Sequence, residues 1–175
     1  MIEYDFTLKF SLPDLNGSPA AYVDALIAAG CDDALIGIGQ QGRIAFNFAR
    51  EAGTAMDAVQ SAIKDIRRVI PGAKLIEATP DLVGLTDVAE LLGFSRQNMR
   101  KIMLGGGATF PLPVHEGKPS IWHLAKILQW LGESGNYSVD SSLLELARVT
   151  MELNIVRELK EIETGAQGEL LALIA

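Results

Sequence analysis

Three cations and two amides stand side by side in the sequence LGFSRQNMRKIM, residues 92–103. They follow Ser95 and are Arg96, Gln97, Asn98, Arg100 and Lys101. Arginine offers a two-pronged donor to guanine O6 and N7, while Gln and Asn pair with adenine N6 and N7. Lysine and serine suit phosphates, which fix position without specifying sequence. This stretch therefore has the donor set needed to read the edges of DNA base pairs.

The elements that would hold these side chains are two short helices within residues 86–103. Thr86 can cap the first helix, Gly93 can take the left-handed conformation that ends it, and Ser95 can cap the second. The apolar residues of the second helix then face inward and its polar residues face outward. Two helices joined by a short Gly-containing turn are typical of a helix-turn-helix, whose second helix enters the major groove. The alternative is an ordinary helical hairpin with a polar surface.

The following stretch, TFPLPVHEGKPSIWHLAKILQWL, carries a second pattern. Residues 82–132 resemble the winged helix-turn-helix of the MerR/excisionase superfamily, which includes AlpA-like regulators. The matching residues after the second helix are Phe110, Pro111, Pro113, Val114, Trp122, Ile127, Trp130 and Leu131. The resemblance implies a recognition helix with Arg96 to Lys101, a strand over residues 110–114, and a wing over residues 115–119. His115 and Lys118 would then lie near the DNA backbone or minor groove.

This chain departs from the family in being acidic and in carrying further segments on both sides. The run Gly105-Gly106-Gly107 is also expected to lengthen the connection after the recognition helix. Trp122 and Trp130 are eight residues apart, and we interpret them as core residues on one face of a helix rather than as platforms for base stacking.

Residues 1–80 predict a separate α+β domain. Strict alternation of apolar and polar residues near the start indicates a strand with one buried face, and its apolar members are Tyr4, Phe6, Leu8, Phe10 and Leu12. The order that follows is helix, strand, strand, helix, strand, which is the ferredoxin-like pattern. Met56 is among the apolar residues at helical spacing in residues 54–70. We expect this domain to dimerise, to sense a ligand or to dock a partner.

Residues 136–175 predict a long helix and an apolar tail. Apolar residues recur at three- and four-residue spacing over residues 139–163, as in a helix that pairs with another helix. They are Val139, Leu143, Leu146, Val149, Leu153 and Val156. We therefore expect this segment to make the chain oligomeric, with the tail packing on the body or on a partner protein.

Composition narrows the functional classes. The net charge is −7 and the pI is near 4.8, but residues 81–135 carry five acids and five bases. This is too little positive charge for one copy to bind DNA tightly, because non-specific affinity comes mainly from phosphate neutralisation. A homodimer on paired half-sites is expected. Cys31 is the single cysteine, which excludes an intrachain disulfide and a cysteine-rich zinc site, and favours a cytoplasmic location. No signal peptide and no membrane span are expected.

No catalytic constellation is apparent. His115 and His123 are eight residues apart with no acidic or thiol partner at ligand spacing, so we expect no metal, no cofactor and no enzymatic activity. Two classes remain: a sequence-specific regulator that binds double-stranded DNA as a dimer, and an antitoxin or adaptor that mainly binds a partner protein. In the second class the partner would bind the N-terminal domain or the apolar tail.

Overall fold

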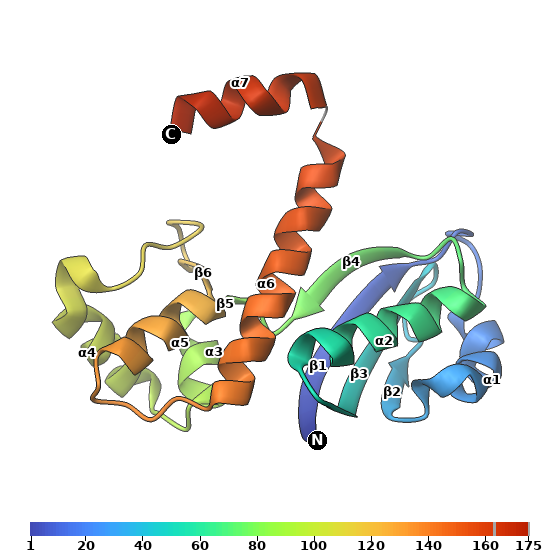
Figure 1. Ribbon diagram of the computed structural model, residues 1–175, viewed down its shortest axis with the longest axis horizontal. Coiled ribbons are helices and arrows are strands. Elements are labelled where there is room, and N and C mark those ends of the chain that lie inside the picture. Colours follow the sequence, from blue (N-terminus) through green and yellow to red (C-terminus); the bar gives the residue numbers. More distant parts are fainter. Residues whose placement is uncertain (163, 175) are drawn as a thin grey trace.

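The computed structural model describes residues 1–162 and 164–174. The chain forms two bodies, one built on a four-stranded sheet and one mainly helical, with a long helix between them (Figure 1). The prediction of a mixed α+β fold is confirmed. No helix in these two ranges is long and apolar enough to cross a membrane.

The sheet contains β1 (Ile2–Ser11), β2 (Ala34–Gly37), β3 (Arg43–Ala52) and β4 (Lys74–Thr79). All neighbouring strands are antiparallel, in the order β2-β3-β1-β4. The predicted alternation of β1 is confirmed, because its four expected inward residues are buried, as is Leu12 just beyond its end. Phe6 of β1 stacks on Phe48 of β3 with ring centroids 5.1 Å apart. Period-two patterning therefore assigned the buried face of this sheet correctly.

Helical segments supply the layer that covers that face. A 3-10 turn (Pro19–Tyr22), α1 (Val23–Leu26) and a π-helical turn (Ile27–Cys31) follow one another, and α2 spans Ala55–Val69. Thr54 caps α2 by accepting the Asp57 N–H at 3.1 Å. Most apolar residues of α2 are buried, but Met56, which shares their helical spacing, is 50% exposed.

The second body contains β5 (Leu82–Val83), α3 (Leu85–Leu91), α4 (Arg96–Gly106), a 3-10 turn (Gly107–Thr109), β6 (Trp122–His123) and α5 (Leu124–Glu133). Strands β5 and β6 pair antiparallel. Trp122 lies in β6 and not on a helix with Trp130, so their expected common helix face was wrong. Both indoles nevertheless pack edge-on against Phe110, with ring centroids 6.1 and 5.1 Å away.

The three consecutive glycines do not lengthen a loop, contrary to expectation. Gly105 and Gly106 form the last turn of α4, and Gly107 has a positive φ of 50°. Gly106 lies against the Trp130 ring, where an added Cβ would come within 2.7 Å of a ring carbon. No atom lies within 4 Å of the corresponding position on Gly105. The second glycine therefore permits the close packing of α4 on α5.

This difference leads to a paired prediction. Gly106→Ala is expected to destabilise the chain by about 1–3 kcal/mol, because the added methyl group overpacks against an aromatic ring. Gly105→Ala is expected to stabilise it by up to about 1 kcal/mol, because alanine is the better helix former. Urea unfolding followed by circular dichroism measures both. Equal effects of the two substitutions would contradict the packing of Gly106 on Trp130.

The long helix α6 (Ser141–Glu161) starts at its cap Asp140, and α7 (Thr164–Ile174) follows. Glu163, the expected end of the long helix, lies outside the described residues. Leu146 is buried in the core of the sheet body, and Ala147 is buried in the core of the helical body. The first half of the apolar seam that was expected to pair with another helix therefore packs within the chain, where it contributes to both hydrophobic cores.

Polar contacts also join α6 to the sheet body and to the helical body. Asn154 of α6 donates to Ala78 O and accepts from Ala78 N–H, as a neighbouring strand would, at 2.8 and 2.9 Å. Its amide also donates to Asp81 Oδ2 at 2.7 Å, and His123 Nδ1 lies 2.6 Å from Asp81 Oδ1. Asp81 is 1% exposed. The sequence offers His123 no acidic partner at ligand spacing, and the fold supplies one from 42 residues away.

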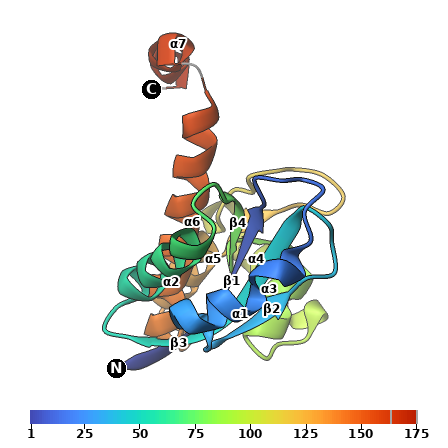
Figure 2. The ribbon, with the colours of Figure 1, turned by 90° about the vertical axis from the view of Figure 1, so that its right-hand side faces the viewer.

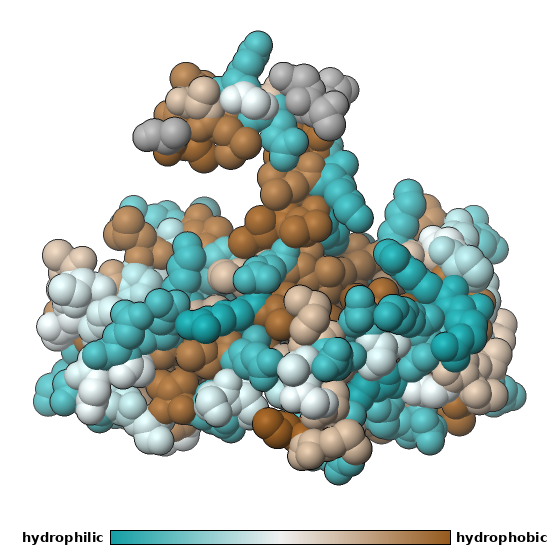
Figure 3. Space-filling model, viewed as in Figure 1, coloured by the Kyte–Doolittle hydropathy of each residue, from teal (hydrophilic) through white to brown (hydrophobic). Residues whose placement is uncertain are grey.

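The far end of α6 and all of α7 extend away from both bodies (Figures 1 and 2). Large apolar side chains are exposed along this extension, and Figure 3 shows brown surface over α7 and the adjoining end of α6. The exposed fractions reach 80% at Leu173 and 82% at Ile174. The extension therefore presents an apolar surface that the described chain leaves uncovered.

Candidate nucleic-acid interface

Helices α3 and α4 form a compact pair joined by the four residues 92–95. The chain reverses at Gly93, whose φ is 66°, and the Phe94 N–H donates to Ala89 O at 2.7 Å. The start of α3 differs from expectation. Gly84 is the cap, with its N–H donated to the Asp87 carboxylate at 2.7 Å, and Thr86 lies exposed in the first turn. The start of α3 is therefore capped by Gly84 and Asp87, and not by the Thr86 hydroxyl that the sequence suggested.

Helix α4 has one buried face and one polar face. Ser95 caps it as predicted, accepting the Asn98 N–H at 3.1 Å. Met99 is fully buried, and Ile102 is buried beside it. The exposed residues of the first two turns are Arg96, Gln97, Asn98, Arg100 and Lys101. The polar residues that were predicted to face outward are therefore exposed, on a helix whose opposite face packs in the hydrophobic core.

A loop follows α4 where the sequence predicted a strand and a wing. Residues 110–114 form no strand, but the chain turns back on itself through a bridge between His115 and Ile121. The Ile121 N–H donates to His115 O at 2.9 Å, and Val114 N–H donates to Ile121 O at 2.8 Å. A Cβ at Gly117 would overlap the His115 imidazole. This 115–121 loop is thus pinned by backbone bonds and covered by one of its own side chains.

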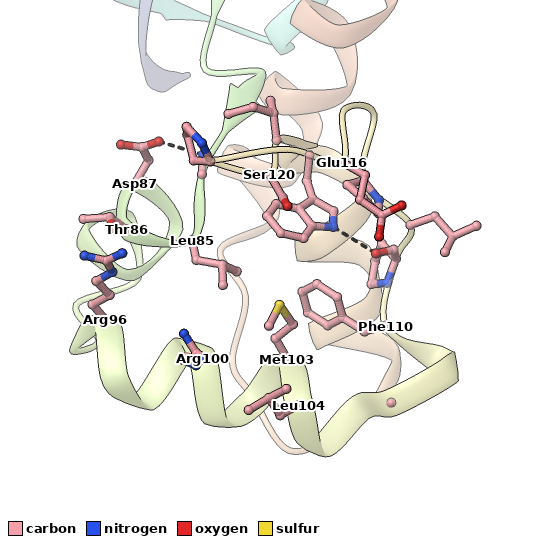
Figure 4. A pocket seen from close by; sticks show the side chains of 18 residues that line it. Leu85, Thr86, Asp87, Arg96, Arg100, Met103, Leu104, Phe110, Glu116 and Ser120 are labelled. Carbon is pink, nitrogen blue, oxygen red and sulfur yellow. Dashed lines mark hydrogen bonds between the residues drawn. The ribbon is translucent and has the colours of Figure 1, made fainter.

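A second fixed point sits at the base of the 115–121 loop. The Trp122 indole N–H donates to Pro111 O at 2.9 Å, and Phe110 is buried against both indoles. Figure 4 shows this bond as a dashed line beside Phe110. Aromatic packing therefore anchors both ends of the loop, which leaves its exposed tip to face outward.

Between α3, α4 and the 115–121 loop lies a groove of about 730 Å³. Arg96 and Arg100 line it from α4, and Glu116 and Ser120 line it from the loop. In Figure 4 Arg96 extends from α4 toward Thr86, while Met103 and Phe110 lie farther along the same space. The structure thus brings the two arginines together with the loop. From the sequence, Thr86 was assigned only as a helix cap and Glu116 only as part of the wing, and Ser120 was not identified, so only the fold reveals these three residues as lining of this groove.

The remaining predicted site residues are distributed around this groove. Asn98 and Lys101 line a separate hollow on the α5 side of α4, together with Tyr137. His115 and Lys118 are exposed in the loop. Within residues 1–162 and 164–174, neither arginine of the groove, nor Lys101, nor Lys118 takes part in a salt bridge. Their charges are consequently free to meet phosphate groups.

In those same ranges, no three His, Cys, Asp or Glu side chains are grouped so that they could hold a metal ion. The exposed side chains of α4 and of the 115–121 loop can offer hydrogen-bond donors and positive charge to an extended anionic ligand. No family model, no curated protein and no solved structure matches this chain.

Proposed function

We propose that the chain is a transcription regulator that binds a specific sequence of double-stranded DNA as a homodimer in the cytoplasm. Residues 81–135 would be a winged helix-turn-helix of the MerR/excisionase type, with α4 as recognition helix and the 115–121 loop as wing. Residues 1–80 would be a ferredoxin-like domain, a proposal supported by the strand order β2-β3-β1-β4 and by helices on one face.

The observation that supports DNA binding most is the composition of the exposed face of α4. Two Arg, one Gln, one Asn and one Lys occupy six consecutive positions of a helix whose opposite face is buried. A rigid helix of about 10–12 Å diameter fits the major groove. Arg and the amides can read base edges, while Lys101, Ser95, His115 and Lys118 can contact the backbone. The free side of the Ser95 hydroxyl remains a donor after capping.

A dimer follows from the charge. Five bases and five acids in residues 81–135 give one copy little net attraction for DNA. Two copies can place their recognition helices in successive major grooves, about 34–36 Å apart. The linked second contact then gains from a high effective concentration.

One observation favours the second candidate function, an antitoxin or adaptor that mainly binds a partner protein. Exposed apolar side chains on α7 are the kind of surface that marks protein interaction sites. Co-purification from cell extract followed by gel filtration separates the two candidates. A stable complex with a different protein, without DNA affinity of the isolated chain, would favour the adaptor.

The test of DNA binding starts with selection from a pool of duplexes that carry a randomised segment. The full chain is expected to enrich one motif, and titration against that duplex then compares variants. Arg96→Ala and Arg100→Ala are each expected to weaken specific binding by about 1–3 kcal/mol and to relax preference at one base position. Lys118→Ala is expected to weaken binding to all sequences equally and to lower the salt slope by about one.

The matched control is Arg43→Ala, which removes an exposed cation at the start of β3, in the other body. It is expected to change affinity little. Absence of any enriched motif would contradict sequence-specific recognition. Equal losses on selected and random duplexes for the two α4 variants would show that these arginines only contact phosphate.

A further inference from the structure

An apolar groove runs between α2 and α6 on the opposite side of α6 from the helical body. Its apolar residues are Met56, Val59, Ile63, Val149, Leu153 and Val156. The groove encloses about 660 Å³, and polar lining is confined to Gln60, Glu152 and the cations of α2. Met56 and Val156 are half exposed. A groove of this composition is suited to an amphipathic helix.

Cations border the α2 side of this groove. They are Lys64, Arg67 and Arg68, on two successive turns. Arg68 is held by Asp65 at 3.4 Å and by Ala29 O at 3.0 Å. Lys64 and Arg67 form no salt bridge with any residue in the described ranges. An occupant with an acidic group beside its apolar face would therefore meet uncommitted positive charge.

Helix α7 combines an exposed apolar face with an acidic residue beside it. Leu170, Leu173 and Ile174 recur at the spacing of one helix face, and all three are exposed. Glu169, four residues before Leu173, lies beside that face and forms no salt bridge within the described chain. With 11 residues, α7 is about 16 Å long. The groove-lining part of α2, from Met56 to Arg68, covers about 18 Å, which matches that length.

We propose that α7 of one copy docks in the α2–α6 groove of a second copy, and that the exchange is reciprocal. The α7 helix does not touch the groove of its own chain, because α6 carries it away from α2 (Figures 1 and 2). In the complex Glu169 faces the partner's Lys64 and Arg67, while Leu170, Leu173 and Ile174 cover the apolar floor. A two-fold interface of this kind repeats each contact twice.

This inference rests on the proposed pairing of two copies and names the surface that achieves it. It keeps only the second half of the pairing seam expected from the sequence, because Val149, Leu153 and Val156 line the groove, whereas Leu146 is buried within one chain. Because α4 lies on the opposite side of α6 from the groove (Figure 1), docking leaves the polar face of α4 uncovered. The interface is therefore compatible with DNA binding and does not depend on it.

The test measures the mass of the full chain by light scattering and by sedimentation over a range of concentrations, without DNA. The parent is expected to be a dimer. Leu173→Ser with Ile174→Ser is expected to raise the dimer dissociation constant roughly tenfold or more, because apolar burial is lost in both halves. Leu35→Ser, at an apolar residue exposed on β2, is the matched control and is expected to leave the constant unchanged.

A charge exchange tests the partner surfaces directly. Glu169→Lys alone, and Lys64→Glu with Arg67→Glu, are each expected to weaken the dimer, and the combined variant is expected to recover much of the loss. A parent that stays monomeric at all concentrations would overturn the proposal. This holds equally if the parent is monomeric because α7 packs on its own chain. A dimer that tolerates the α7 substitutions would also overturn it, as would one in which the charge exchange restores nothing. Loss of DNA binding by a chain that still dimerises would bear only on the proposed function.

Discussion

Arg50→Ala is expected to lower the free energy of unfolding by about 3 kcal/mol, near the lower end of what breaking a buried ion pair costs. Arg50 is 7% exposed, and its guanidinium donates to Asp33 at 2.7 and 2.9 Å, to Asp65 at 2.9 Å and to Gly30 O at 2.5 Å. It also lies over the Phe48 ring, 4.8 Å from the centroid. Its removal leaves the Asp33 carboxylate and the Gly30 carbonyl without their donor, although Asp33 keeps some contact with water and Asp65 keeps its longer contact with Arg68 at 3.4 Å.

The charge of Arg50 is held firmly in this setting. Burial lowers the pKa of Arg50, but the hydrogen bonds that it donates to Asp33 and Asp65, together with the negative charges of these carboxylates, raise it by more, so the net pKa lies above the usual value. The side chain therefore stays charged over the whole working range of pH. It joins the turn after α1, strand β3 and helix α2, which fixes the first helical segment on the sheet.

Arg68→Ala is the matched control, because Arg68 also contacts Asp65 but is 64% exposed. A loss below about 1 kcal/mol is expected there. Urea unfolding gives both values. Cys31 supplies a second readout, because it is fully buried and burial raises the pKa of its thiol to about 11. Thiol reagents at pH 8 are therefore expected to label Cys31 only after local opening, and faster in Arg50→Ala. Equal stability losses at Arg50 and Arg68 would contradict this account.

Asn154→Asp is expected to cost about 3 kcal/mol at pH 8, although the two side chains have the same shape. The amide N–H that now donates to Asp81 and to Ala78 O would be replaced by a carboxylate oxygen. Two facing carboxylates cannot both stay ionised at this distance, so the pKa of the introduced carboxyl rises above its usual value. At pH 8 the introduced carboxyl must then either take up a proton on folding or remain charged beside Asp81, and both cost free energy.

The sign of the pH dependence follows from that raised pKa. Below the unfolded value the introduced carboxyl is protonated in both states and costs least, and the stability deficit grows as pH rises above about 4. The deficit relative to the parent is therefore expected to be smaller at pH 5 than at pH 8. The parent is measured at each pH as the reference for this comparison.

Asn47→Asp is the matched control, since Asn47 is exposed and only accepts a hydrogen bond from Thr7. A carboxylate can accept that bond equally well, so a change within about 0.5 kcal/mol is expected. Urea unfolding at pH 5 and at pH 8 measures the stability change of each of the two variants relative to the parent. A deficit at Asn154 that does not depend on pH would show that Asp81 and Asn154 are not in contact.

The sequence by itself determined what depends on neighbours along the chain. Period-two alternation identified the buried face of β1. Ser95 marked the start of α4, and Gly93 marked the end of the helix before it. The polar face of α4 was likewise predictable, because burial of Met99 and Ile102 leaves the intervening residues outside. Thr86 was misassigned because two competing caps, a hydroxyl and the pair of Gly84 with Asp87, stand next to each other.

Only the tertiary structure decided what those faces pack against. The spacing of α6 predicted an apolar seam, but it could not say that Leu146 and Ala147 would close two different cores within one chain. Asp33, Arg50 and Asp65 are far apart in sequence, as are Asp81, His123 and Asn154, so no local pattern announces either cluster. Periodicity encodes which side of an element avoids water, whereas its partner is chosen by shape, charge and hydrogen bonds between segments that meet only after folding.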